Sequence, residues 1–219
     1  MGPNKKILIV VAHPDDETLG CGGLISPGQH VLMTDIEDNK KGKRVCSYTI
    51  VANAVNDGSI ILTHPLYSNR IWGSILENRY LEQYADLKNI RAEIKEGDSR
   101  FDFYGERENG KKCFMEVKSA PLASIDISPE NRKYSCTSGM AEKEKRISYF
   151  PDGYRKKKGD VVSPRALKHI QHLTELVQNG NEGDLIFIIP RMDSTGFILN
   201  PWDKIYKDAV ERGQKEGVR

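Results

Sequence analysis

Two groups of residues in this chain have the types and spacing of a reactive site, and they lie far apart in the sequence. The first is in AHPDDETLGCGG, residues 12–23, where His13, Asp15 and Asp16 follow a short apolar run. A strand end can present a histidine and a carboxylate to a metal ion, and a further carboxylate can activate a water molecule. This segment therefore predicts a metal site at the end of a strand.

The second group is in SRFDFYGERENGKKCFMEVKSA, residues 99–120. Glu116 and Lys118 are two residues apart in a predicted strand, so both side chains project from the same face. Asp102 interrupts an apolar run on the neighbouring strand in the same way. Two carboxylates and a lysine in one patch can hold a hard cation through oxygen ligands and place a charged donor beside the activated water. The alternative is an exposed sheet face with alternating polar residues.

The length of the loop between these two strands tests the second site. A two-residue loop at Asn109–Gly110 places Asp102 opposite Val117, so that Asp102 faces away from Glu116. A three-residue loop, or a bulge in either strand, shifts the pairing by one residue and places Asp102 opposite Glu116. The site hypothesis therefore predicts a three-residue loop or a bulge in this hairpin.

The elements around both groups differ between the two halves of the chain. The first third has short strand patterns and an NDG hairpin signal at 56–58, which predict a small antiparallel β unit. The second half alternates helix and strand. We expect strands at 5–12, 30–36, 47–55, 59–64, 90–97 and 184–190, and helices at 74–89 with Ser74 as N-cap, at 163–180 with Ser163 as N-cap, and at 200–213 with Asn200 as N-cap.

The composition is that of an ordinary soluble chain. It has 219 residues, enough for one large or two small domains, with 38% hydrophobic residues and a net charge of +2. It has no apolar run long enough to span a membrane and no signal peptide pattern, so we expect a cytoplasmic protein that binds no membrane. The four cysteines form no CxxC pair and are interpreted as free thiols, which disfavours zinc ribbons and thioredoxin-like chemistry.

Two basic runs stand out against this nearly neutral total. They are interpreted as solvated loops or, if they share one side of the protein, as a surface that follows a phosphate backbone. Their members are Lys40, Lys41, Lys43 and Arg44 in the first run, and Arg155, Lys156, Lys157 and Lys158 in the second.

Residues 24–219 resemble the sugar fermentation stimulation protein (SfsA) family. The resemblance rests on LISPGQHVLM, DNKKGKR, SYTIV, SRFDFYGE, CFMEVKSAPL, YFPDGYRKKKGDVVSPRALKHIQHL and LIFIIPRMDSTGFILNP, in this order. It implies an α+β protein that has a small N-terminal OB-like β-barrel at 24–82, followed by a restriction-endonuclease-like PD-(D/E)xK domain at 83–219. It also implies a DNA-binding protein linked to sugar utilisation.

The resemblance also assigns roles to individual residues. The acidic and lysine motif falls on Asp102, Glu116 and Lys118, with Asp102 and Glu116 as ligands of Mg²⁺ or Mn²⁺. Glu93 matches a further upstream carboxylate, and Lys168 with His169 matches a basic pair on the following helix. Together with Arg165, this pair is expected to contact DNA.

Residues 5–23 resemble a different family, the LmbE-like (PIG-L) N-acetylglucosamine deacetylases. That resemblance implies zinc bound by His13 and Asp16, with Asp15 as general base. The sequence after the two glycines, LISPGQ, leaves room for barely one helical turn, whereas that family continues with a full helix. The further histidine would have to come from His64, His169 or His172, and the predicted β unit at 30–64 does not fit a parallel sheet.

The chain therefore looks composite, with residues 1–23 as an atypical segment. The favoured hypothesis is a DNA-binding protein of the SfsA type with a divalent-metal nuclease site, which would make it a Mg²⁺- or Mn²⁺-dependent deoxyribonuclease. The alternative is a zinc-dependent deacetylase that acts on an N-acetylated sugar through His13, Asp15 and Asp16. A third possibility is a structural or regulatory protein with neither activity.

Overall fold

The computed structural model describes residues 30–35, 48–54, 58–64, 66–124, 146–151 and 159–219. These residues form a mixed α+β protein. Its strands are β1 (His30–Asp35), β2 (Tyr48–Ala54), β3 (Ile60–Leu62), β4 (Lys88–Glu96), β5 (Ser99–Glu106), β6 (Lys112–Ser119), β7 (Ala123–Ser124), β8 (Arg146–Phe150), β9 (Glu182–Ile188) and β10 (Ser194–Leu199). Its helices are α2 (Leu66–Glu77), α3 (Pro164–Gln178) and α4 (Lys204–Glu216), with a 3₁₀ turn, η1, at Glu82–Tyr84.

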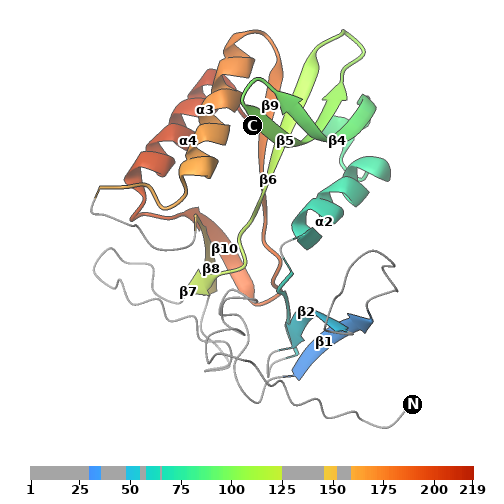
Figure 1. The fold of residues 1–219 in the computed structure, drawn as a ribbon, viewed down its shortest axis with the longest axis vertical. Coiled ribbons are helices and arrows are strands. Elements are labelled where there is room, and N and C mark those ends of the chain that lie inside the picture. The colour runs from blue at the N-terminus through green and yellow to red at the C-terminus, as the bar shows by residue number, and fades with distance from the viewer. Residues whose placement is uncertain (1–29, 36–47, 55–57, 65, 125–145, 152–158) are drawn as a thin grey trace.

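The strands form three sheets. The first has the order β1-β2-β3 and is antiparallel throughout. The central sheet has the order β4-β5-β6-β9, in which β5 pairs with β4 and β6 in antiparallel fashion and β6 pairs with β9 in parallel. The third has the order β10-β8-β7. Figure 1 shows β6 running between helices from the upper part of the molecule toward this third sheet.

The two faces of the central sheet bury separate hydrophobic cores. Because side chains alternate along a strand, β6 contributes Phe114 to one face and Met115 and Val117 to the other. The first core lies under α3 and α4, where Ile170 and Leu173 are fully buried. The second lies under α2 and includes Trp72, Leu76, Tyr84 and Leu87. The sheet is therefore sandwiched, with α3 and α4 on one side and α2 on the other (Figure 1).

Helix α3 confirms the helix predicted at 163–180. Ser163 is its N-cap, because the Ser163 side chain accepts a hydrogen bond from the Ala166 N–H, and Pro164 occupies the first turn. Helix α4 begins later than predicted. Its N-cap is Asp203, which accepts from the Tyr206 N–H, whereas the Asn200 side chain accepts from the Trp202 N–H and donates to the Pro151 carbonyl.

The helix predicted at 74–89 is wrong in its bounds. Helix α2 ends at Glu77, because Arg79 takes a left-handed φ of 54°. The side-chain amide of Asn78 donates to the Ser74 carbonyl at this helix end. Ser74 lies inside the helix rather than at its start. The residues after Arg79 form η1 and the buried Leu87, and β4 begins only at Lys88.

The N-terminal sheet confirms the predicted antiparallel β unit, with β1, β2 and β3 close to the expected ranges. It is joined to the rest of the molecule by backbone hydrogen bonds. The Leu62 N–H donates to the Pro190 carbonyl at 2.7 Å, and the Met192 N–H donates to the Ile60 carbonyl at 3.0 Å.

Three further expectations concern the organisation of the chain. Residues 5–12 and the whole of segment 1–23 lie outside the described residues, so the OB-like barrel stays a prediction. The division at 82/83 stays a prediction, although α2 packs on the central sheet. Among the helices that the structure describes, none is long and apolar enough to cross a membrane.

Candidate metal and nucleic-acid site

The hairpin between β5 and β6 has the three-residue loop that the site hypothesis required. Glu106 pairs with Lys112, and the Arg107 N–H donates to the Lys111 carbonyl at 2.8 Å, so the loop is residues 108–110. Gly110 has a φ of 83°, a left-handed conformation that glycine adopts without steric cost. Continuing this register along the strands brings Asp102 level with Glu116, as the hypothesis predicted.

The regular pairing of β5 with β6 ends one residue before Asp102. The last pair is Phe103 with Met115, and the Asp102 carboxylate then accepts the Val117 N–H at 2.7 Å. Its other oxygen accepts from the Asn69 side chain of α2 at 2.8 Å. Burial raises the pKa of Asp102, and the negative charge of Glu116 raises this pKa further. The two carboxylates therefore interact electrostatically across the end of the hairpin.

Glu116 is almost entirely buried, with 3% of its surface exposed. One of its oxygens, Oε1, accepts from Lys118 Nζ and is hydrogen bonded to Nδ1 of His169 on α3. The other oxygen, Oε2, is buried without a hydrogen-bond partner. The hydroxyl of Tyr206 on α4 is also buried without one, and its pKa is raised by burial and then by the charge of Glu116. A buried carboxylate oxygen without a partner is uncommon, and a bound water molecule or ion would satisfy it.

This donor set fits a hard cation better than zinc. Mg²⁺ is commonly held by one or two carboxylates, with water and substrate phosphates completing its coordination. Asp102 and Glu116 supply the two carboxylates, and Glu116 Oε2 supplies the free oxygen. Across the part of the chain that the structure describes, no three or more His, Cys, Asp or Glu residues are grouped so that they could enclose an ion.

Glu93 lies at the edge of this site. The pairing of Ala92 with Phe103 and of Ile94 with Phe101 makes Glu93 the residue of β4 that falls level with Asp102. Its φ of 58° is left-handed, and its exposed carboxylate forms an ion pair with Arg100 at 2.7 Å. The carboxylate of Glu93 is thus engaged at the surface.

The predicted basic pair on α3 is divided between surface and interior. Lys168 is exposed, and its ammonium donates to the Asp98 carbonyl in the β4–β5 turn at 2.9 Å. His169 is 4% exposed and faces Glu116, so its ring supports the carboxylate from inside the protein. Arg165 is exposed one turn earlier. The histidine contact with Glu116 could not be read from the sequence, because it joins residues 53 positions apart.

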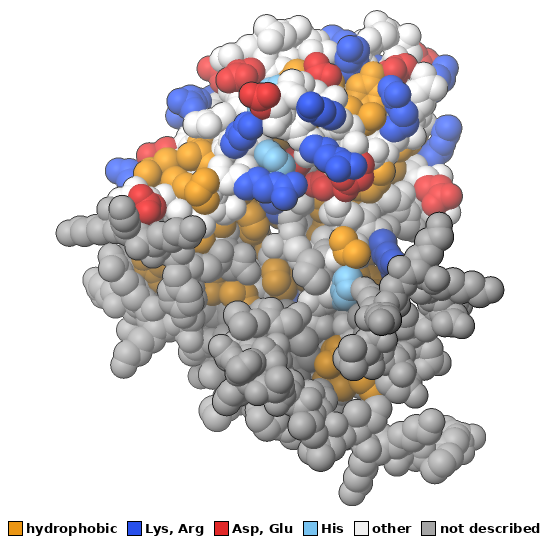
Figure 2. Space-filling view, in the orientation of Figure 1, with side chains coloured by type: hydrophobic (Ala, Val, Ile, Leu, Met, Phe, Trp, Pro, Cys, Tyr) orange, Lys and Arg blue, Asp and Glu red, His pale blue; other side chains and the backbone are white. Residues whose placement is uncertain are grey.

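The surface above the site carries both signs of charge. Figure 2 shows lysine and arginine side chains gathered over α3, β4 and β5, with acidic side chains among them. Lys95, Arg100, Arg165 and Lys168 are exposed cations of these elements. The remaining predicted site residues lie outside the described part of the chain: His13, Asp15 and Asp16 of the zinc alternative, and Lys40, Lys41, Lys43, Arg44, Arg155, Lys156, Lys157 and Lys158 of the basic runs.

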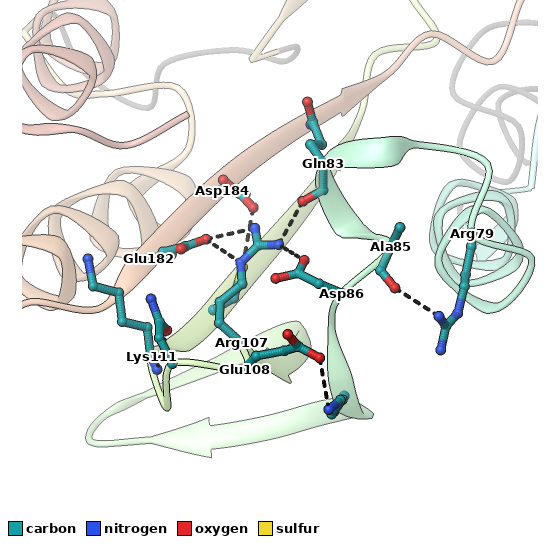
Figure 3. A network of polar contacts seen from close by, with 12 residues as sticks. Arg79, Gln83, Ala85, Asp86, Arg107, Glu108, Lys111, Glu182 and Asp184 are labelled. Carbon is teal, nitrogen blue, oxygen red and sulfur yellow. Dashed lines mark hydrogen bonds and ion pairs between the residues drawn. The ribbon is translucent and has the colours of Figure 1, made fainter.

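A second polar network, which no sequence pattern indicated, lies at the opposite end of β6 and β9. Figure 3 shows the Arg107 guanidinium between Glu182, Asp86 and the Gln83 carbonyl, and the bond to Glu182 measures 2.8 Å. Arg219 bonds to Glu182 and to Asp184. Burial acts to raise the pKa of Glu182, but Arg107 and Arg219 lower it overall. Both arginines of the network are paired with carboxylates, so it is a structural tie between the hairpin and β9.

Cys113 of β6 lies beside this network. It is a free and fully buried thiol, as the sequence predicted for the cysteines, and its Sγ lies 3.4 Å from Asp184 Oδ2. Burial and then the charge of Asp184 raise the pKa of the thiol. A buried thiol with a raised pKa is a poor nucleophile, so Cys113 is interpreted as part of the structural core.

The fold and the site define a mixed α+β protein with a carboxylate and lysine site on a central β-hairpin. The family model described as "Sugar fermentation stimulation protein RE domain" matches residues 66–130 and 135–219. The chain therefore belongs to the SfsA family.

Known relatives extend the similarity to nearly the whole chain. A sugar fermentation stimulation protein homolog of Alkaliphilus oremlandii is 27% identical over 99% of this chain and 83% of its own length. A homolog of Alteromonas mediterranea is 28% identical over 96% of this chain and 78% of its own length. Because the first alignment leaves out only 1% of the chain, it includes most of residues 1–23, which favours a single SfsA-type chain over a composite one.

A solved structure supports the fold. The Pyrococcus furiosus SfsA structure, described as a complex with Ca²⁺, matches 90% of this chain and 71% of its own chain, with a TM-score of 0.67 and 20% sequence identity. At this level of identity the likeness concerns the fold alone.

Proposed function

We propose that this protein binds DNA and cleaves its phosphodiester bonds with Mg²⁺ or Mn²⁺ held by Asp102 and Glu116. The observation that carries the proposal is the buried Oε2 of Glu116, which has no hydrogen-bond partner. Burial and then the charge of Glu116 raise the pKa of Asp102, so the two carboxylates repel each other. A divalent cation would relieve this repulsion and satisfy the free oxygen. The Ca²⁺ in the description of the Pyrococcus structure is in keeping with such a site in the family.

The arrangement of elements supports a restriction-endonuclease-like domain. An antiparallel hairpin, β5–β6, carries the acidic residues and the lysine, and β6 continues the sheet in parallel with β9. Helix α3 covers the face of β6 on which Glu116 lies and supplies His169 to it. The N-terminal β unit, in this proposal, is part of an OB-like barrel that adds a second surface for nucleic acid.

Each residue of the site has a separate task. When bound, Mg²⁺ or Mn²⁺ would polarise the phosphodiester and lower the pKa of a water molecule. Asp102 is held in place by the Val117 N–H and by Asn69, and Glu116 by His169 and Lys118. Lys118 also places an ammonium at the carboxylate, where it can orient the attacking water and stabilise the negative charge that develops on the phosphate.

The exposed cations around the site supply attraction for the phosphate backbone. Lys168 and Arg165 lie on α3, and Arg100 lies on β5. Each phosphate contact by a lysine or arginine releases counterions, so DNA binding should weaken as salt concentration rises. The family membership links this activity to proteins named for the stimulation of sugar fermentation.

The test compares cleavage of labelled plasmid and short duplex DNA by the wild type, Glu116→Gln and Glu108→Gln in Mg²⁺ or Mn²⁺. Glu108 is a matched control, because it lies on the same hairpin but is exposed and paired with Lys88. We expect cleavage that is lost in Glu116→Gln and kept in Glu108→Gln. Cleavage that survives in Glu116→Gln would refute the site.

Two other outcomes separate the remaining hypotheses. A salt-sensitive mobility shift without cleavage in any variant would show that the fold binds DNA without cutting it. Absence of both cleavage and shift, together with stoichiometric zinc that is lost in His13→Ala, would replace the proposal with the deacetylase alternative.

A further inference from the structure

The start of α2 carries an aromatic and basic cluster that the proposed nuclease chemistry does not use. It consists of His64, Tyr67 and Arg70, and we call it the α2 cluster. The His64 and Tyr67 rings meet edge to face, with centroids 5.8 Å apart. The Arg70 guanidinium lies over the Tyr67 ring, 5.4 Å from its centroid. Tyr67 and His64 are partly exposed and Arg70 is exposed, so solvent reaches all three residues.

The cluster is held in place by the helix. The Leu66 N–H donates to Nδ1 of His64 at 3.3 Å, so this ring acts as a cap for α2. The Tyr67 N–H donates to the His64 carbonyl at 3.1 Å. Tyr67 and Arg70 are three residues apart on the helix and therefore share one face. A platform fixed in this way loses little conformational entropy when it binds a flat ligand.

The cluster is also tied to the candidate metal site. Asn69 lies between Tyr67 and Arg70 in the sequence of α2, and its side chain donates to Asp102 at 2.8 Å. A ligand that rests on Tyr67 would thus be held by the helix that positions Asp102.

We propose that the α2 cluster is a stacking platform for an unpaired nucleobase, and that the protein therefore prefers single-stranded DNA. This inference rests on the proposed nucleic-acid function and names its substrate class. Proteins bind single-stranded nucleic acid with aromatic rings and arginines side by side. The face of a base stacks on the aromatic ring, and the negative charge of a phosphate pairs with the arginine. In a duplex the bases stack on one another, and no base face is presented to Tyr67.

The test measures binding by fluorescence anisotropy in EDTA, which prevents metal-dependent cleavage. The probes are a labelled oligo(dT) and a mixed-sequence duplex of the same length. We expect Tyr67→Ala to weaken oligo(dT) binding by about 5- to 150-fold, the range that one stacked base provides, while duplex binding changes by less than about two-fold. Tyr67→Phe should keep the wild-type affinity, because the ring is retained.

Tyr80→Ala is the matched control, since Tyr80 is a tyrosine with 70% of its surface exposed beyond the far end of α2. It should leave both affinities unchanged. A second readout uses an oligonucleotide with a single 2-aminopurine, whose fluorescence should change on binding to the wild type and to Tyr67→Phe but not to Tyr67→Ala.

The outcomes separate this inference from the proposed function. If the wild type binds the duplex in a salt-sensitive way and Tyr67→Ala leaves oligo(dT) binding unchanged, the platform is refuted and the DNA-binding proposal stands. An equal loss on both probes would also refute the platform, because stacking does not act on paired bases. If the wild type binds neither probe, both the platform and the proposed function fail.

Discussion

Asp193 is the single carboxylate between two arginine side chains, and it lies in the connection between β9 and β10. It accepts from Arg191 Nε at 2.6 Å and Nη2 at 2.7 Å, and from Arg146 Nη1 at 2.6 Å. Its side chain is 3% exposed, as is that of Arg191. The adjoining residues 190–192 bond to β3, so this group joins the N-terminal sheet to β8 and β10. We predict that Asp193→Ala lowers the free energy of unfolding by about 3–5 kcal/mol, because it leaves buried guanidinium charge without its counter-charge.

Urea denaturation followed by circular dichroism at pH 7 measures this change. The control is Glu211→Ala, which removes an exposed ion pair with Lys207 at 3.7 Å and should cost only about 0.3–0.5 kcal/mol. Asp193→Asn keeps an oxygen acceptor without the charge, so its loss in free energy of unfolding should lie between the losses in Asp193→Ala and Glu211→Ala. If Asp193→Ala lowers the free energy of unfolding as little as Glu211→Ala does, the reasoning is refuted, because the buried guanidinium groups would then not need the Asp193 carboxylate.

The stabilisation by Asp193 depends on pH through the pKa of its carboxyl group. Burial acts to raise the pKa of Asp193, but the hydrogen bonds and charges of Arg191 and Arg146 lower it overall. A lowered pKa in the folded state means that the carboxylate stabilises the protein above its unfolded pKa of about 3.9, and that this stabilisation is lost as the pH falls through the folded pKa. The difference between the wild type and Asp193→Asn should therefore be full at pH 7 and shrink in acid.

Three further predictions concern the site and its supports. Asp102→Asn should raise the stability of the metal-free protein at pH 7, because burial and the charge of Glu116 raise the pKa of Asp102, so that its ionised form destabilises the folded state. Denaturation at several pH values should show that this gain vanishes below the unfolded pKa of about 3.9. Glu93→Gly should raise the midpoint of thermal unfolding, because it removes the strain of a left-handed φ, worth about 1 kcal/mol, and loses only one exposed ion pair with Arg100. A lower midpoint would show that the backbone of Glu93 is not strained. Ser163→Ala should cost about 1 kcal/mol in urea through loss of the α3 cap, whereas no change would show that the cap is dispensable.

Local sequence patterns predicted the elements that depend on nearby residues. Ser163 and Pro164 marked the start of α3 because a helix cap is made within one turn. The strands on either side of Gly110 followed from alternation and a turn signal. The helix at 74–89 failed because its apolar spacing belongs partly to α2 and partly to η1, and the break at Arg79 depends on backbone conformation rather than on hydrophobic period.

By itself, the sequence determined the family, the α+β class and the residues with the right chemistry. It placed Glu116 and Lys118 on one strand face, since alternation in a strand is a local property. It left the hairpin register open between two alternatives, and the three-residue loop decided between them.

Only the tertiary structure decided what surrounds these residues. It brought His169 from α3 onto Glu116, left Glu116 Oε2 without a partner and placed Asn69 of α2 on Asp102. It also turned Glu93 toward Arg100 at the surface. The physical reason is that burial and long-range hydrogen bonds arise from the packing of helices on both faces of the central sheet, and this packing joins residues that no local pattern connects.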